Sequence, residues 1–221
     1  MNLEQARTNM VEQQIRTWQV LDQEVLDLLY VVPREEFVPR EHRALAFSDL
    51  ELPIEEGVKA GERMWQPKLE ARVLQELMLK KTDRVLEVGT GSGYLTALLA
   101  HRAGHVCSVE IKPALAAFGR RNLERHGVDQ VTLETGDAAR GWPRHAPYDA
   151  IVLTGSTPLL PRAFLEQLAP GGRLFAVVGA APAMRARLVT CSAPGAWRSA
   201  DLFETVIAPL ANAERGPQFR F

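Results

Sequence analysis

The chain has 221 residues and a formal net charge of −1 at pH 7, with 46% hydrophobic and 24% charged residues. This is an ordinary globular balance, and it excludes a general electrostatic attraction for nucleic acid or an anionic membrane. No run approaches the roughly 18 apolar residues of a membrane span, and the N-terminus lacks the basic and apolar regions of a signal peptide. We therefore expect a globular, cytoplasmic protein with no nucleic-acid or membrane partner.

The cysteines and histidines indicate neither a disulfide framework nor a metal site. The two cysteines, Cys107 and Cys191, are too few for such a framework. Cys107 lies in an apolar run, which predicts a small buried residue. The histidines show no spacing typical of metal ligands, so no metal is assigned: His42, His101, His105, His126 and His145.

Helical periodicity dominates residues 3–32. Apolar residues recur there at spacings of three and four, which predicts two helices separated near Thr17 and Trp18. Asp22 precedes the second helix and is expected to cap it.

Two segments without helical periodicity follow. Residues 33–39 are bounded by prolines and predict a compact turn, whose charged residues 34–36 are expected to be solvated and receive no chemical role. Residues 46–66 show no clear period, and so long a loop inside a domain is usually functional. We expect this loop to be a lid. Pro67 then opens a helix with five apolar residues on one face: Leu69, Val73, Leu74, Leu77 and Met78.

A glycine-rich turn at residues 89–93 is the feature around which the chain is organised. The apolar run 84–88 predicts a buried strand that leads into it, and a helical pattern starts at Tyr94. Gly89 and Gly91 let the backbone turn sharply and let a ligand approach. A nucleotide-like ligand would meet free backbone N–H groups there.

Carboxylates follow the next two predicted strands. The strand 105–111 carries Glu110 near its end, 19 residues beyond Gly91, a spacing that suits hydrogen bonds to ribose hydroxyls. The strand 131–134 leads into Gly136 and Asp137. Because parallel strands end at one rim of a sheet, these residues favour an adenosine pocket over a purely structural turn.

The rest of the chain continues the alternation of strands and helices. A helix starts at Pro113 and is closed by Gly127. The remaining elements are a strand at 148–153, a helix at 161–168, a strand at 173–178 and two strands at 184–191 and 197–209. This order predicts an α/β fold with a mostly parallel sheet that finishes with an antiparallel pair.

These motifs together resemble S-adenosylmethionine-dependent methyltransferases and, within that class, the protein-L-isoaspartate O-methyltransferase family. The glycine turn is shared by many methyltransferases, whereas the run Val32–Pro39 is far more specific. The other segments similar to the family are Met10–Ile15, Leu52–Ile54, Val85–Tyr94, Gly141–Pro143, Ala146–Ile151 and Gln167–Leu174.

The resemblance implies a Rossmann-like, doubly wound, mostly parallel seven-stranded sheet with an antiparallel C-terminal pair and an N-terminal helical cap. Residues 1–80 would form the cap and the substrate or lid loop, and residues 81–221 the core that binds S-adenosylmethionine. Protein or peptide carrying isoaspartate would be the substrate. The sequence leaves the oligomeric state open.

The resemblance also assigns roles to individual residues. Glu87 would lie near the methionine amino group or the N–H groups of the turn, Glu110 on the ribose and Asp137 at the adenine amino group. Each could instead be an ordinary solvated acid at a strand end, and Trp142 could line the adenine site or pack in the core. The expected cofactor residues are Glu87, Gly89, Thr90, Gly91, Gly93, Glu110, Ile111, Gly136, Asp137 and Thr154.

The substrate half departs from the family pattern. Trp65 occupies the position where family members place a hydroxyl beside the methyl donor, and Glu55 stands where glycine is usual. The expected substrate residues are Ile54, Trp65, Gln66 and Ser156.

Two interpretations of Trp65 remain open. Its indole could fill the space that a peptide carboxylate enters, which predicts weak or absent turnover of isoaspartyl peptides. Alternatively, Trp65 packs in the core, and Ser156 or Thr157 supplies the hydroxyl. The chain is then either a methyltransferase for isoaspartyl or other acceptors, or a binding module that keeps the cofactor without catalysis. No catalytic residue is assigned, because a carboxylate nucleophile is already ionised near neutral pH.

Overall fold

The computed structural model describes residues 2–54 and 62–214 of the chain, and within them the strands form a seven-stranded sheet in the order β5-β4-β3-β6-β7-β8-β9 and a small two-stranded sheet, β1-β2. Strands β3 to β7 pair in parallel, whereas β8 is antiparallel to β7 and β9 to β8. The expected α/β sheet with an antiparallel C-terminal pair is confirmed. The strands of the large sheet are β3 (Arg84–Val88), β4 (His105–Glu110), β5 (Val131–Thr135), β6 (Tyr148–Leu153), β7 (Leu168–Ala180), β8 (Ala183–Ala193) and β9 (Ala196–Glu204).

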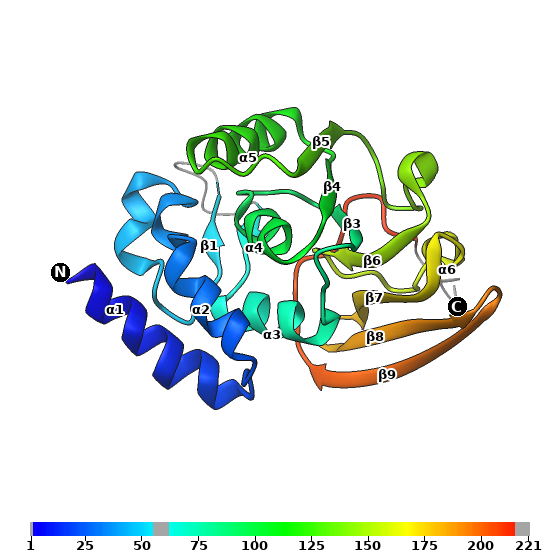
Figure 1. Ribbon diagram of the computed structural model, residues 1–221, viewed down its shortest axis with the longest axis horizontal. Helices are drawn as coiled ribbons and strands as arrows, with labels where there is room; N and C mark the ends of the chain where they lie inside the picture. The colour runs from blue at the N-terminus through cyan, green and yellow to red at the C-terminus, as the bar shows by residue number, and fades with distance from the viewer. Residues whose placement is uncertain (1, 55–61, 215–221) are drawn as a thin grey trace, which may run out of the picture.

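Helices cover both faces of this sheet (Figure 1). One face packs beneath α3 (Pro67–Leu77), α4 (Tyr94–Arg102) and α5 (Pro113–Arg125), and its strand residues belong to a large apolar cluster. The other face packs against α6 (Arg162–Glu166) and the segment around Trp142. Alternate residues of the parallel strands supply the two faces, as the two-residue period of a strand requires.

The N-terminal helices lie beyond α3 and α4, away from the sheet (Figure 1). Helical structure runs through α1 (Leu3–Asn9), a π-helical segment (Met10–Ile15) and a 3-10 turn (Arg16–Trp18). Gln19 then adopts a left-handed conformation with φ of 64°, which ends the helix. The expected break near Trp18 is therefore confirmed.

The second N-terminal helix, α2 (Gln23–Val31), begins where the sequence indicates. The Asp22 side chain accepts a hydrogen bond from the backbone N–H of Glu24 at 2.9 Å. This contact satisfies one of the free N–H groups at the helix start, and the expected cap is confirmed.

The loop 46–66 contains more structure than its aperiodic sequence indicates. Strand β1 (Leu52–Pro53) pairs with β2 (Arg63–Met64), and two 3-10 turns, Arg34–Glu36 and Arg40–Leu45, precede them. Residues 55–61 lie outside the described residues. They include Glu55, which replaces the usual glycine of the family, and the central part of the expected lid.

Three predicted element ends are wrong. Met78 does not share the buried face of α3, because it lies after the helix end in a left-handed conformation and is 66% exposed. Helix α6 ends at Glu166, since Leu168 already pairs with Tyr148 in the sheet. Strand β9 ends at Glu204 rather than at 209, and the chain beyond it turns back toward β6.

One apolar cluster connects the N-terminal helices to the sheet, from Met10 to Ile207. The division at residue 80 therefore remains a proposal about organisation. No helix within the described residues is long and apolar enough to cross a membrane.

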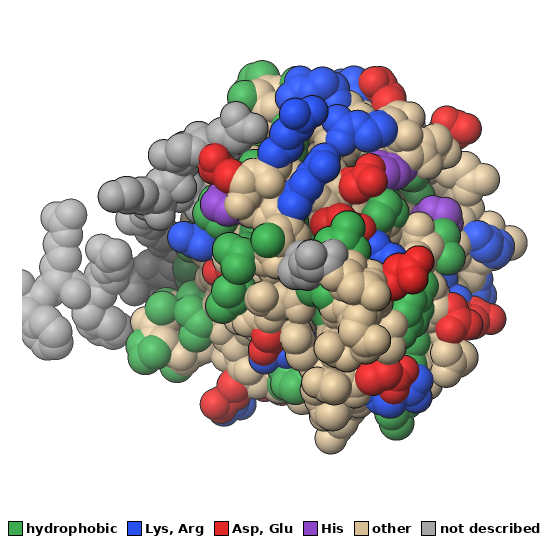
Figure 2. Space-filling view, turned by 90° about the vertical axis from the view of Figure 1, so that its left-hand side faces the viewer, with side chains coloured by type: hydrophobic (Ala, Val, Ile, Leu, Met, Phe, Trp, Pro, Cys, Tyr) green, Lys and Arg blue, Asp and Glu red, His purple; other side chains and the backbone are tan. Residues whose placement is uncertain are grey.

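Basic side chains gather on α5, at the top of the face seen in Figure 2. Arg120, Arg121 and Arg125 are exposed there. Arg120 donates to the carbonyl of Leu133, and Arg121 lies over the ring of Phe118 at 5.9 Å. These local contacts fit a solvated helix face, which is the simpler interpretation of the arginines.

Candidate active site

A cavity with an empty volume of about 970 Å³, including space open to solvent, lies at the C-terminal ends of β3, β4, β5 and β6. This is the rim where open α/β sheets bind ligands, and the volume suits a small-molecule site. The cavity brings together the predicted donor and acceptor residues Ile54, Trp65, Glu87, Gly89, Thr90, Gly91, Glu110, Ile111, Gly136, Asp137 and Thr154.

The glycine turn is closely packed against the next parallel strand. Gly89 has φ of 101°, and a Cβ built on it would lie 2.1 Å from Oγ1 of Thr154. That hydroxyl donates to the carbonyls of Val88 and Gly89 at 2.8 and 3.0 Å. Thr154 therefore holds the end of β6 against the turn.

Glu110 is buried at the end of β4 and already contacts the turn. Its carboxylate accepts hydrogen bonds from the backbone N–H of Gly91 at 2.9 Å and of Lys112 at 3.0 Å. These bonds fix the carboxylate on the cavity wall, beside the glycine turn.

Glu87 is fully buried beneath the same wall. Its Oε2 accepts from the hydroxyls of Ser108 at 2.6 Å and Thr96 at 2.5 Å. Its Oε1 has no hydrogen-bond partner among the described residues. Burial raises the pKa of Glu87 to about 8; the two hydroxyl bonds lower it, and nearby Glu110 raises it.

The C-terminal segment completes the cavity, which sequence analysis missed. Residues 208–211 line the cavity. Two backbone hydrogen bonds of 2.9 Å join this segment to Ser156: the N–H of Ser156 donates to the carbonyl of Ala208, and the N–H of Leu210 donates to the carbonyl of Ser156. Asn212 donates to the carboxylate of Asp137 at 2.9 Å. In the sequence, the apolar run up to Pro209 is indistinguishable from a continuation of β9. The sequence therefore carries no local signal that the chain turns back toward the cavity.

Three predicted site residues lie outside the cavity lining. Gly93 caps α4 with φ of 82° and packs against Gly119 of α5. Ser156 turns its hydroxyl away, donating to the carbonyl of Ile207 at 3.2 Å. Gln66 precedes α3 and makes no side-chain capping bond. The substrate contacts expected of Ser156 and Gln66 stay predictions.

Trp65 both lines the cavity and packs in the core. Its side chain is 6% exposed, and its ring meets Phe175 of β7 edge-on at 6.4 Å. The alternative hydroxyl of Thr157 donates to the carbonyl of Leu159 at 2.5 Å. The hydroxyl proton of Thr157 is therefore already donated within its own loop.

Of the three charged residues 34–36 that were expected to be solvated, two are buried. Arg34 is 1% exposed and Glu35 is 8% exposed. Arg34 forms an ion pair with Glu70, and Arg7 pairs with Glu35 at 2.5 Å. The ionic partners, Arg7 and Glu70, lie in helices that are distant in sequence. The residues of the turn alone therefore do not indicate these ion pairs.

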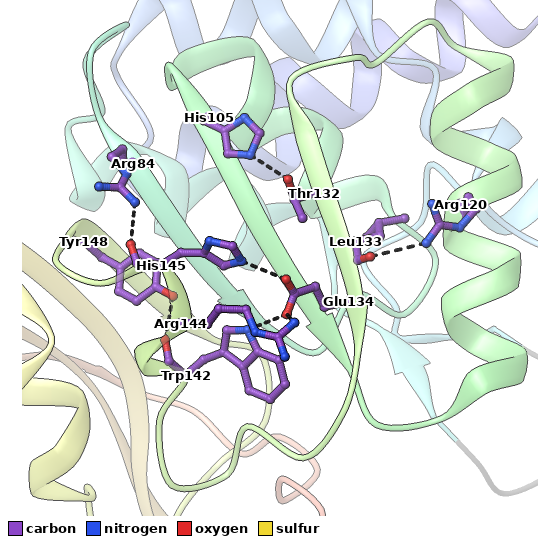
Figure 3. A network of polar contacts seen from close by, with 10 residues as sticks. All are labelled: Arg84, His105, Arg120, Thr132, Leu133, Glu134, Trp142, Arg144, His145 and Tyr148. Atoms are coloured by element: carbon purple, nitrogen blue, oxygen red, sulfur yellow. Dashed lines mark hydrogen bonds and ion pairs between the residues drawn. The ribbon is translucent and has the colours of Figure 1, made fainter.

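A second polar network lies around Glu134 of β5, close to Gly136 in the cavity wall (Figure 3). Glu134 of β5 accepts hydrogen bonds from Trp142 Nε1 at 2.8 Å, His145 Nε2 at 2.7 Å and Arg144 at 3.2 Å. The bond from His145 contributes most to holding the pKa of Glu134 below its usual value. Trp142 packs against Gly136 rather than lining the cavity, since a Cβ on Gly136 would lie 2.7 Å from its ring.

The same network brings one group of potential metal ligands together. Atoms of Cys107, Glu134 and His145 lie within 4.8 Å of one another. The carboxylate of Glu134 already has a cationic partner in Arg144, and burial raises the pKa of the Cys107 thiol to about 12. The guanidinium competes with a cation for this carboxylate, and we assign no metal among the described residues.

The sheet order, the glycine turn and the acids at the strand ends define the class of this protein. That class is the S-adenosylmethionine-dependent methyltransferases, and the cavity lies at the C-terminal rim of a Rossmann-like sheet.

Sequence comparison narrows the class to one family. The family model described as Protein-L-isoaspartate(D-aspartate) O-methyltransferase (PCMT) matches residues 5–215. Protein-L-isoaspartate O-methyltransferase 2 of Pelobacter propionicus is 40% identical over 215 residues, which are 96% of this chain and 93% of that protein. Protein-L-isoaspartate O-methyltransferase of Methanoculleus marisnigri is 44% identical over 173 residues, 78% and 77% of the two chains.

Solved structures agree with this placement. A chain named protein-L-isoaspartate O-methyltransferase matches with a TM-score of 0.80 at 26% identity, over 93% of this chain and 66% of its own, just under two thirds. A putative enzyme of that name from Plasmodium falciparum, in complex with S-adenosyl-L-homocysteine, has a TM-score of 0.76 at 20% identity, covers 92% of this chain and 97% of its own, and shows the common fold. The chain belongs to the protein-L-isoaspartate(D-aspartate) O-methyltransferase family.

Proposed function

We propose that this protein transfers the methyl group of S-adenosylmethionine to the isoaspartyl carboxylate of a peptide or protein. One observation carries the proposal: a single cavity is lined by the glycine turn and strand-end acids on one side and by residues 62–65 on the other. A donor and an acceptor would therefore meet inside one cavity.

The residues present fit the cofactor. S-adenosylmethionine carries a sulfonium and an ammonium cation, and the cavity lining includes Glu87, Glu110 and Asp137. The buried Oε1 of Glu87 has no partner among the described residues, so the ionised form of this carboxyl would offer an acceptor to a cationic group of the ligand. We assign Glu110 to the ribose hydroxyls and Asp137 to the adenine amino group.

Removal of the Glu110 carboxylate tests the cofactor assignment. Glu110→Ala should weaken binding of S-adenosylhomocysteine by about 1.5–3 kcal/mol, or roughly ten- to hundredfold. The reason is that the ribose hydroxyls of the ligand lose a charged acceptor. Calorimetric titration measures the change. Glu124→Ala is the control, since it removes an equal charge from the exposed face of α5.

The wild type and Glu110→Ala test two separate statements, the presence of a cofactor site and the role of Glu110. No binding by the wild type would refute the cofactor site, whereas unchanged affinity of Glu110→Ala would refute only the role of Glu110.

The chemistry requires positioning more than acid–base catalysis. S-adenosylmethionine supplies an electrophilic methyl group, and an acceptor carboxylate is ionised near neutral pH. The chain's own residues then align the two reactants and exclude water. Trp65 contributes an apolar wall and one N–H donor, without the hydroxyl that the family pattern places there.

The decisive experiment compares an isoaspartyl peptide with its aspartyl twin, using a radiolabelled methyl donor. We expect selective labelling of the isoaspartyl peptide, at a low rate because Trp65 narrows the acceptor side. Trp65→Ser should increase kcat/KM for that peptide. Wild-type turnover of about 1 per second or faster would show that Trp65 does not obstruct the acceptor.

Another acceptor, or binding without catalysis, is the second candidate function. The observation that favours it is the buried indole of Trp65 in the cavity wall. Normal binding of S-adenosylhomocysteine with no labelling of the isoaspartyl peptide by either the wild type or Trp65→Ser would favour this candidate.

We further propose that the protein acts in the cytoplasm. Cys107 and Cys191 are both free and buried, a state that suits a compartment where thiols remain reduced.

A further inference from the structure

Arg34 is an arginine with an almost completely buried guanidinium group. Its Nε donates to the carbonyl of Ala46 at 3.0 Å, and its terminal nitrogens contact the Glu70 carboxylate and the carbonyl of Trp65. The guanidinium also lies over the ring of Tyr94, 5.1 Å from its centre. Its five donors lie in a rigid plane on three nitrogens, whereas the three donors of a lysine share one nitrogen and cannot reproduce this geometry.

These partners lie in or next to the two sides of the cavity. Trp65 and Glu70 line its acceptor side, with Glu70 in α3. Tyr94 is the first residue of α4 and directly follows the glycine turn of the donor side. One side chain from the turn 34–36 therefore connects the backbone of Trp65 to the start of the helix that follows the donor turn.

Stability alone does not explain a buried ion pair at this place. Taking two charges out of water costs free energy that their attraction often only offsets, and apolar replacements can be equally stable. The hydrogen bond to the Trp65 carbonyl adds a geometric constraint that an apolar residue could not provide. Trp65 has its ring against Phe175 and its carbonyl on Arg34, so both ends of the residue are held.

We propose that Arg34 is a positioning residue for the methyl acceptor, because it fixes the backbone of Trp65 relative to the donor turn. The inference rests on the proposed function in one respect: the acceptor must enter the side of the cavity that Trp65 lines. Arg34 itself touches neither reactant.

Arg34→Lys tests this role, and Arg173→Lys is its matched control. Arg173 also bonds several groups, donating to the carbonyls of Leu77 and Met78 and to Asp83, but at the opposite end of the sheet. Both variants keep their charge and lose the planar set of donors. Both are expected to lower the melting temperature.

Three readouts separate positioning from stability. Arg34→Lys should increase deuterium uptake in segments 52–54 and 62–66, leave the affinity for S-adenosylhomocysteine within about twofold, and lower kcat/KM for an isoaspartyl peptide by roughly tenfold or more. Arg173→Lys should leave local uptake, affinity and kcat/KM as in the wild type. The same pattern in both variants, or unchanged uptake in Arg34→Lys, would overturn the proposal.

Glu70→Gln distinguishes the bond to Trp65 from the ion pair. Glutamine retains an acceptor for Arg34, so uptake at 62–66 should stay close to the wild-type value; a rise equal to that of Arg34→Lys would overturn the proposal. The exchange measurement needs no acceptor. Failure of isoaspartyl turnover would therefore refute the proposed function, and the exchange result would still decide the role of Arg34.

Discussion

Glu87 shows how strongly position determines the chemistry of a single residue. Its carboxyl is fully buried, and burial raises its pKa from 4.5 to about 8. The folded protein therefore binds more protons than the unfolded chain between these two values. By proton linkage, the free energy of unfolding falls as the pH rises through that interval.

Glu87→Gln should remove this pH dependence. The variant should match the wild type near pH 4, below the unfolded pKa of 4.5 where Glu87 is protonated in both states, and exceed its stability at pH 9 by on the order of a few kcal/mol. Urea unfolding at several pH values measures the difference. The exposed Glu124→Gln serves as the control, and parallel pH curves for the wild type and Glu87→Gln would contradict the assignment.

Arg34, Trp65 and Glu70 show a limit of sequence reading at the residue scale. The sequence predicts a solvated turn at 34–36 because the residues are charged and lie between prolines. Arg34 can be buried because it pairs with the carboxylate of Glu70. That partner lies 36 residues further along the chain, so the turn itself does not reveal it. A charged residue is compatible with either place until that partner is known.

At the element scale, the segment 136–147 depends on contacts with β5. Glu134 accepts bonds from three residues of that segment, Trp142, Arg144 and His145. Tyr148 adds a bond from its hydroxyl to the carbonyl of Trp142 at 2.6 Å. The network therefore holds the segment that begins at Gly136 and Asp137 in the cavity wall, although none of the network side chains lines the cavity.

Glu134→Gln should weaken the segment without removing a cofactor contact. The amide keeps one acceptor but loses its charge, so we expect a loss of roughly 1–3 kcal/mol in the free energy of unfolding. Affinity for S-adenosylhomocysteine should fall severalfold, because Gly136 and Asp137 follow directly in the chain. Thermal melting and calorimetry measure the two effects. Unchanged affinity together with lowered stability would show that the network supports the fold alone.

The glycine turn and the strand ends were predictable because their signals are local. A buried strand, a turn with positive φ and a helix start occupy consecutive residues, so their order alone specifies their geometry. Parallel pairing then places Glu87, Glu110 and Asp137 at one rim. The return of residues 208–212 had no such signal, since it depends on pairing with Ser156 across the fold.

At the scale of the whole molecule, one apolar cluster joins the N-terminal helices to the sheet. The donor turn and the acceptor wall are consequently placed by the same packed core. This arrangement makes the acceptor side sensitive to core residues such as Phe175, which contacts Trp65, and to buried ionic residues such as Arg34.

The sequence by itself determined the α/β order of elements and the antiparallel end of the sheet, because these follow from periodicity. It also indicated the cofactor class and the family, because its short motifs resemble those of known methyltransferases. The tertiary structure alone decided the burial of Arg34, the orientation of Ser156 and the closure of the cavity by the C-terminal segment. These features depend on contacts between distant residues, such as Asn212 with Asp137, 75 positions apart. Local patterns do not encode which distant side chains will meet, and packing of the complete core settles that choice.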